Sequence, residues 1–199
     1  METQQSQNSS QIAAVNAALA SNSEIPVGAS VVYAMHGKCT VLAVETRDLG
    51  GQTQKFYKLE VQKSPLSRST RFEPAIWVPV ATALARGIRA PMTLTDVEQA
   101  FEVFASREYY LPLNDHWNVA QGKIEALVRN EGAVGVAKSL SFLFVLKKKQ
   151  VVPYPEVNRI TETIQKQFTK EVSELTGETM KAVEERIAKS MKQKLLADN

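Results

Sequence analysis

The sequence of 199 residues predicts an α+β fold, in which a small β-barrel module is followed by an all-α helical bundle. Between residues 25 and 89, short runs of β-branched and aromatic residues alternate with turn residues, which is typical of strands. Beyond Pro112, apolar residues recur at helical spacing in successive segments. This change of pattern predicts two small domains, and the 44% hydrophobic content is enough to give each a core.

The first 24 residues are predicted to be a mobile tail. They are rich in Gln, Asn, Ser and Ala, a composition that buries little apolar surface, although residues 12–20 have the composition of a short helix. No Lys or Arg precedes this short apolar stretch, so the basic region of a secretory leader is missing. The cytoplasm is therefore the expected location.

A β-rich module is predicted over residues 25–109, and four strands are expected in it. These strands are residues 27–34, 38–47, 55–62 and 75–80. His36-Gly37 and Gly50-Gly51 suit the tight reversals between them, because glycine adopts positive φ without steric cost. A polar, basic loop that contains proline separates the third strand from the fourth. A meander of this length favours a small barrel.

A short amphipathic helix is predicted to close the β-rich module. Thr95 and Glu98 have the spacing of a capping box, T-x-x-E. Apolar residues then follow at helical spacing, namely Val97, Ala100, Phe101 and Phe104. Residues 109–113 are predicted to form an extended linker to the second domain.

Four helices are predicted in the second domain, residues 110–199. They are residues 115–129, 133–149, 157–175 and 178–196. The second of them is apolar on nearly every face, which indicates a position in the middle of a bundle. The last carries many charges beside a thin apolar stripe. Two roles remain open for it, since it either dimerises the protein or packs against the bundle.

No motif in the sequence indicates an enzyme. Phosphate-binding glycine loops, zinc-protease histidine pairs and nucleophile elbows are all missing, and His36 and His116 have no obvious nucleophile or carboxylate partner. The single cysteine, Cys39, cannot form an intramolecular disulfide, and the two histidines do not complete a zinc site with it. We therefore expect a non-enzymatic protein without catalytic residues, metal or cofactor, in which Cys39 is packed in a strand.

The charge distribution permits contact with nucleic acid but does not require it. Residues before Tyr110 include 10 basic and 10 acidic side chains, whereas residues from Tyr110 on include 14 basic and 11 acidic ones. The net charge of +3 therefore belongs to the helical half. No apolar run free of charges approaches the roughly 18 residues of a membrane span, so no membrane partner is expected.

Several short motifs follow one another in the order found in a known family. The β-rich segment contains V-G-x-x-V-V-Y, an H-G turn and an E-T-R at the end of the second strand, and I-W-V-P-V and the helix D-V-E-Q-A-F-E-V-F follow. These motifs resemble the CarD family, whose N-terminal module is shared with the polymerase-interacting domain of transcription-repair coupling factors. The helical half is similar to the C-terminal domain of that family, and the resemblance covers nearly all of residues 25–176.

The resemblance implies a bacterial transcription regulator. The N-terminal module would be Tudor-like and bind the RNA polymerase β subunit. The helical domain would contact promoter DNA at the upstream edge of the transcription bubble, without reading a specific operator, and the protein would stabilise the open complex. Such a regulator is expected in the cytoplasm, associated with the nucleoid when it is bound to polymerase. The alternative is an adaptor that docks on polymerase but binds protein instead of DNA.

The resemblance also implies which residues meet the partners. Arg47 matches an arginine that the family uses against polymerase, and Trp77 replaces a second basic contact, either as an aromatic anchor or as a core residue. Trp117, at the start of the first helix of the helical domain, would insert into the minor groove beside unstacked bases, or else it caps the bundle core. Lys123 would contact phosphate.

A run of three lysines ends the second helix of this domain. Lys147, Lys148 and Lys149 favour the helix macrodipole in any protein, because cations are stabilised near the carboxyl end of a helix. The same run is also a candidate phosphate-contacting patch on DNA. Both interpretations remain open from the sequence.

Overall fold

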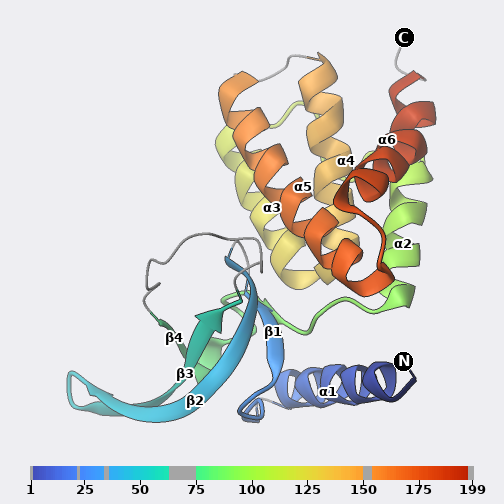
Figure 1. Ribbon diagram of the computed structural model, residues 1–199. Helices are drawn as coiled ribbons and strands as arrows, with labels where there is room; N and C mark the ends of the chain where they lie inside the picture. Colours follow the sequence, from blue (N-terminus) through green and yellow to red (C-terminus); the bar gives the residue numbers. More distant parts are fainter. Residues whose placement is uncertain (1, 22, 34–35, 63–74, 150–153, 197–199) are drawn as a thin grey trace. The chain divides into compact units, whose positions relative to one another are not determined.

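The computed structural model describes residues 2–21, 23–33, 36–62, 75–149 and 154–196, and it is α+β, as predicted (Figure 1). The chain forms two compact units, Met1–Pro91 and Met92–Asn199, which we call the β unit and the helical unit. The boundary predicted after residue 109 therefore lies too far along the chain. The polar loop expected between the third and fourth strands falls mostly on residues 63–74, outside the described residues.

The β unit contains a five-stranded antiparallel sheet with the strand order β4-β3-β2-β1-β5. Its strands are β1 Ser30–Tyr33, β2 Gly37–Leu49, β3 Gln52–Val61, β4 Ile76–Pro79 and β5 Ile88–Arg89. The sequence did not predict β5, because two residues are too few for an alternating pattern. Among the described strands, β4 and β5 do not pair with each other, so the sheet is open and closure into a Tudor-like barrel is not observed.

A long hairpin of β2 and β3 forms the centre of the sheet. It reverses at Gly50 and Gly51, whose φ angles are 64° and 83°, as the sequence predicted. The pairing register shifts between Val41 and Ala43, which is a β-bulge. Cys39, Val41, Tyr57 and Leu59 are buried on one face of the hairpin, whereas Glu45, Arg47, Lys58 and Glu60 lie on the other face.

The segment predicted to be a mobile tail instead contains helix α1, Glu2–Ala20, which packs on the sheet. Ile12, Val15 and Leu19 share one helical face, and with Ala18 they are buried in the same core as strand residues such as Val31. The sequence analysis allowed a short helix only over residues 12–20 and missed its length and its packing, because a few apolar side chains are diluted by the many polar ones. The helix covers apolar surface of a sheet that does not close on itself.

The chain that leaves α1 is fastened to β3 by two polar contacts. The backbone N–H of Ile25 donates to the buried hydroxyl of Tyr57 at 2.8 Å, and burial raises the pKa of that hydroxyl. Lys55 donates to Glu24 at 2.5 Å, a contact that raises the pKa of the lysine through the hydrogen bond and the carboxylate charge. The chain is therefore anchored to β3 just before the turn that leads into β1.

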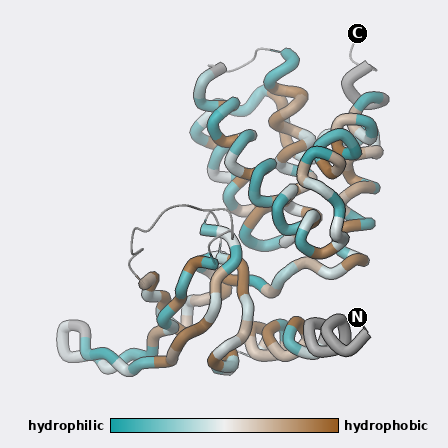
Figure 2. Tube along the Cα trace, viewed as in Figure 1, coloured by the Kyte–Doolittle hydropathy of each residue, from teal (hydrophilic) through white to brown (hydrophobic). Residues whose placement is uncertain are grey.

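The helical unit consists of five described helices around one apolar core. They are α2 Leu94–Ala105, α3 Trp117–Asn130, α4 Gly132–Lys149, α5 Tyr154–Thr176 and α6 Met180–Leu196. Helix α4 is apolar along most of its length and contacts all the others, which confirms its predicted central position (Figure 2). None of the described helices is long and apolar enough to cross a bilayer.

Helix α2 belongs to the helical unit and does not close the β unit as predicted. Phe101 and Phe104 stack edge to face at 5.6 Å, and Phe104 makes a similar contact with Phe168 of α5. The four apolar residues found from the sequence are the ones that α2 buries, but they face α4, α5 and α6. The pattern identified the face correctly, whereas the partner of that face depends on contacts distant in sequence.

The capping box of α2 lies two residues earlier than predicted. Thr93 accepts from the N–H of Asp96 at 3.2 Å, and Asp96 accepts from the N–H of Thr93 at 2.7 Å. Thr95 and Glu98 are exposed instead. We expect Thr93→Ala to lower the free energy of unfolding by about 1 kcal/mol, because a helix-terminal N–H loses its acceptor. Chemical denaturation checks this value, and an equal loss in Thr95→Ala would favour the original prediction.

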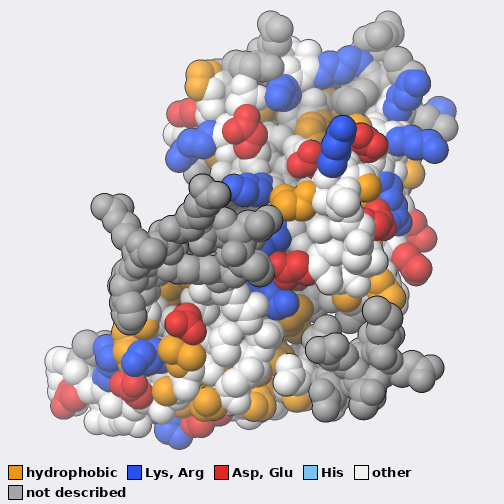
Figure 3. Space-filling view, in the orientation of Figure 1, with side chains coloured by type: hydrophobic (Ala, Val, Ile, Leu, Met, Phe, Trp, Pro, Cys, Tyr) orange, Lys and Arg blue, Asp and Glu red, His pale blue; other side chains and the backbone are white. Residues whose placement is uncertain are grey.

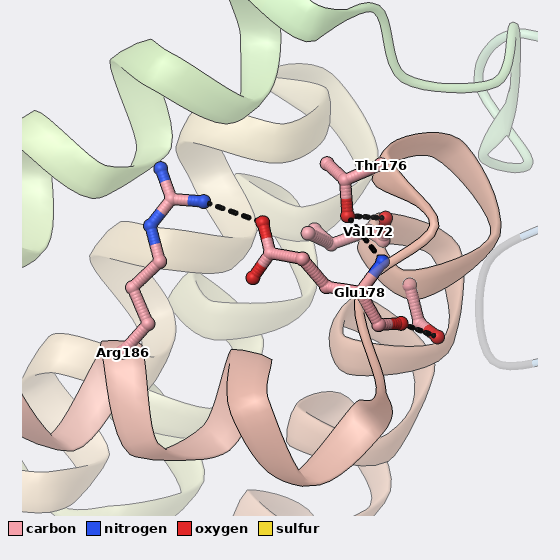
Figure 4. A network of polar contacts seen from close by, with 5 residues as sticks. Val172, Thr176, Glu178 and Arg186 are labelled. Carbon is pink, nitrogen blue, oxygen red and sulfur yellow. Dashed lines mark hydrogen bonds and ion pairs between the residues drawn. The ribbon is translucent and has the colours of Figure 1, made fainter.

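Helix α6 packs against the bundle of its own chain, which is the second of the two roles left open. Val183, Ile187 and Met191 are buried in the core shared with α2 and α5. At the α5–α6 corner, Gly177 has a φ of 77°, and Arg186 donates to Glu178 at 3.1 Å (Figure 4). These contacts fix the direction in which α6 leaves α5.

Candidate functional site

The two residues predicted to meet polymerase lie against each other in the β unit. Arg47 comes from β2 and Trp77 from β4, on either side of β3, and the guanidinium carbon of Arg47 lies 3.2 Å from the Trp77 ring centroid. Arg47 also forms an ion pair with Glu45 at 3.6 Å. A planar guanidinium on an indole face is a favourable cation–π arrangement, worth about 0.5–1 kcal/mol at an exposed site.

The register of the sheet explains why these side chains share a face. Lys58 of β3 pairs with Trp77 on one side and with Ala43 on the other, and side chains alternate along a strand. Ala43, Glu45 and Arg47 are therefore on the Trp77 face, whereas Tyr57 and Val78 point into the core. The sheet brings Arg47 and Trp77 together although 30 positions separate them in the sequence.

Two further residues of β3 complete this surface, and the sequence analysis did not select them. The Lys58 ammonium lies 5.5 Å from the Trp77 centroid, so the indole has a second cation near it. Phe56 pairs with Glu45 and Pro79 and is buried on the same face. The alternation of side chains along a strand, which places Phe56 and Lys58 on the same face, was the sequence signal that could have identified them. We call Arg47, Phe56, Lys58 and Trp77 the Arg47–Trp77 cluster.

A shallow groove of about 600 Å³ begins where β4 ends. It lies between the first residues of β3 and the 3₁₀ turn η2, Val80–Thr82. Its lining residues are Thr53, Gln54, Lys55, Pro79, Val80, Ala81, Thr82 and Arg86. Because Gln54 is the register partner of Arg47, the groove borders the Arg47–Trp77 cluster. Among the described residues, no strand pairs with residues 52–55 on the side away from β2, so this edge suits an extended segment of another protein.

The candidate DNA-contacting residues gather at one end of the helical unit. Helices α3 and α4 form an antiparallel hairpin that turns at Gly132, where φ is 56° (Figure 1). The first residue of α3, Trp117, and the last turn of α4, residues 147–149, therefore lie at the same end. Several Lys and Arg side chains are visible at that end, drawn at the top in Figure 3. We call it the Trp117 end.

At the Trp117 end, the tryptophan is only partly accessible. Trp117 is half-buried and packs against the bundle core, which agrees in part with the core-capping interpretation. Lys123 forms an ion pair with Asp115 at 2.7 Å, a partner that the sequence analysis did not identify. This pair links the segment before α3 to the helix, so Lys123 stabilises the position of Trp117 in the free protein.

The three lysines of α4 have different surroundings. Lys147 is half-buried, whereas Lys148 and Lys149 are exposed. The ammonium of Lys149 lies 5.6 Å from the ring centroid of Tyr109, a residue of the segment between α2 and α3. The sequence analysis placed Tyr109 in a linker and gave it no role. The lysines occupy the last turn of their helix, where the macrodipole favours cations, so both interpretations of this run remain compatible with the structure.

No reactive centre emerges among the described residues. Cys39 lies buried in β2, as predicted, and burial raises the pKa of its thiol from 9.0 to about 11. A thiol of that pKa is almost entirely protonated at neutral pH and is a poor nucleophile. Within the described ranges, no three His, Cys, Asp or Glu side chains are grouped as metal ligands.

Comparison with protein-family models supports the resemblance found in the sequence. Residues 26–81 match the model described as CarD-like/TRCF RID domain, a polymerase-interacting module. The match contains the strands β1 to β4 and both Arg47 and Trp77, whereas α1 and the helical unit lie outside it. A comparison with curated proteins gave no match. The predicted resemblance to the CarD family is thereby confirmed for residues 26–81.

Proposed function

Because residues 26–81 match the CarD-like/TRCF RID domain, we propose that the protein is a non-enzymatic transcription regulator that binds RNA polymerase and promoter DNA. In this proposal the β unit is a Tudor-like module. It docks on the β subunit of polymerase. The helical unit contacts DNA at the upstream edge of the bubble without reading a specific operator. The two contacts together stabilise the open complex, in the cytoplasm and at the nucleoid.

The Arg47–Trp77 cluster is the observation that carries the polymerase contact. Tryptophan and arginine are the residues most enriched at the energetic centres of protein interfaces. Here they are preorganised by stacking, so little side-chain freedom is lost when a partner binds. The adjoining groove and the short edge strand β4, which ends at Pro79, offer an extended partner segment a place beside the cluster.

The Trp117 end supports the DNA contact. At that end an aromatic side chain lies near basic residues, which are the residue type that binds phosphates. Apolar side chains that insert into the minor groove unstack neighbouring bases. Lys148 and Lys149 are exposed in the last turn of α4, where a phosphate can approach them, and Lys123 reaches phosphate by exchanging Asp115 for a phosphate oxygen. The charge excess of the helical half agrees with this assignment.

Modest contacts suffice for regulation of this kind. A contact that exists only in the open complex lowers the free energy of that state alone, and about 1.4 kcal/mol of differential binding changes its population tenfold. At promoters whose open complex is already stable, the same contacts hold polymerase back from escape. The proposal therefore includes activation at some promoters and repression at others.

The test is the lifetime of open complexes formed by cognate polymerase on a ribosomal RNA promoter. We expect the wild-type protein to lengthen the lifetime. Trp117→Ala should shorten it about tenfold even at saturating protein, because it removes a contact of the open complex itself. Arg47→Ala should instead raise the protein concentration needed for the effect, because it weakens docking. An unchanged lifetime with bound wild-type protein contradicts the DNA contact.

Arg129→Ala is the matched control for this experiment. Arg129 is exposed in the last turn of α3, at the end of the hairpin opposite Trp117. Its substitution removes one positive charge, as Arg47→Ala does, but away from both proposed contacts. The alternative, an adaptor whose helical unit binds protein instead of DNA, is distinguished by the salt dependence of binding. DNA affinity that falls steeply with salt reports released counterions and phosphate contacts, whereas salt-insensitive association with protein alone favours the adaptor.

A further inference from the structure

Tyr109 occupies an unusual position at the Trp117 end. Large aromatic side chains are commonly buried, but the Tyr109 side chain is 46% exposed and lies outside any helix. The Lys149 ammonium lies 5.6 Å from its ring centroid, and Arg107 is exposed two positions earlier. An accessible ring is therefore accompanied by cations from two segments of the chain.

The segment that carries Tyr109 is held firmly to the bundle. Leu111 is buried in the core of the helical unit, and Leu113 packs against that core. The Lys138 ammonium lies 5.5 Å from the ring centroid of Tyr110. Asp115 ties the end of the segment to Lys123. The backbone that follows Tyr109 is thus anchored to the bundle, so less chain freedom is lost when a ligand meets this ring.

Tyr109 and Trp117 are close enough to meet one short stretch of DNA. They are eight positions apart in the chain, which limits the distance between their Cα atoms to at most about 29 Å even if the segment is fully extended. Proteins that bind unpaired strands combine cations for the backbone with aromatic rings on which bases stack. Duplex DNA keeps its base faces covered, so an exposed ring gains from stacking only where bases are unpaired.

We propose that Tyr109 is a second base-contacting aromatic residue, which stacks on an unpaired base beside the junction that Trp117 contacts. Lys148 and Lys149 take the adjacent phosphates. This inference rests on the proposed DNA contact and deepens it, because it assigns the helical unit a ligand with both a duplex and an unpaired arm. It predicts that the protein prefers forked DNA to duplex of the same sequence.

The experiment measures binding of the full-length chain to fluorescein-labelled DNA by fluorescence anisotropy at low salt. The probes are a blunt duplex and a fork that shares the duplex sequence and carries an unpaired arm. We expect Tyr109→Ala to weaken fork binding roughly 5- to 140-fold, the range for one lost base stack, and to leave duplex binding unchanged. Tyr109→Phe keeps the ring and should keep the preference for the fork.

The other outcomes overturn the inference in distinguishable ways. If Tyr109→Ala binds the fork as the wild type does, while Trp117→Ala weakens both probes, Tyr109 has no stacking role and the proposed function stands. Equal loss on fork and duplex in Tyr109→Ala assigns the ring to the support of Lys149 and also overturns the inference. No binding of wild-type chain to either probe removes the inference together with the DNA contact. Thermal unfolding of each variant excludes misfolding as the cause.

Discussion

Gly135→Ala is expected to lower the free energy of unfolding of the helical unit by about 3 kcal/mol. A Cβ atom at Gly135 of α4 would lie 1.9 Å from the carbonyl oxygen of Leu127 and 2.6 Å from its carbonyl carbon. Non-bonded carbon contacts prefer roughly 3.5–4 Å, so the backbones of α3 and α4 would have to separate. Because the clash is with backbone, no side-chain rotation relieves it.

Gly122→Ala in α3 is the matched control for this prediction. Nothing lies within 4 Å of a Cβ built at Gly122, so the same substitution should stabilise the helix by about 0.5–1 kcal/mol. The chain has two tryptophans, one in each unit. Urea unfolding can therefore be followed through Trp117 in a Trp77→Phe background. Equal effects at Gly122 and Gly135 would show that α3 and α4 do not cross closely.

Val15→Asp should destabilise the β unit by at least about 2 kcal/mol. The Val15 side chain is fully buried between α1 and the sheet, and burial of a valine contributes about 1.5–3 kcal/mol. An aspartate there loses that contribution and adds the cost of an unpaired carboxylate in an apolar core. The helix can avoid this cost only by leaving the sheet, which exposes the core that it covers.

The neighbouring residue supplies the control for α1. Ala14 is exposed, so Ala14→Asp introduces the same charge on the solvent face and should cost no more than roughly 0.7 kcal/mol of helix propensity. Unfolding followed through Trp77, with Trp117→Phe, reports the β unit. If both substitutions have the same small effect, then α1 contributes nothing to the core and residues 1–24 behave as the tail that composition predicted.

Local patterns predicted most of the secondary structure, because strand alternation, helical spacing and glycine turns act over a few residues. The Gly50-Gly51 reversal, the central position of α4 and the buried face of α2 were all identifiable in this way. The partner of α2 and the docking of α1 were not, since both depend on which apolar faces meet. Thr93 was missed as a cap because Thr95 with Glu98 matches the T-x-x-E signature, whereas Thr93 is followed three positions later by Asp96.

For the candidate site too, the sequence identified single residues but not the contacts between distant segments. Arg47, Trp77 and Trp117 were selected from a resemblance, and the sheet register then explained why the first two touch. Phe56 and Lys58 join them only through cross-strand pairing. The Asp115 partner of Lys123 and the Lys149 neighbour of Tyr109 connect residues whose spacing follows no regular period. Contacts of this kind become visible only when the segments are placed in space.

The protected state of Cys39 makes the protein well suited to site-specific labelling. Its thiol is the only one in the chain, and burial leaves it almost wholly protonated at the pH at which maleimides are used. A cysteine introduced at an exposed position, such as Lys148→Cys, would therefore react selectively without removal of the native residue. Paired with a second label on a promoter fragment, it would test whether the Trp117 end approaches DNA as proposed.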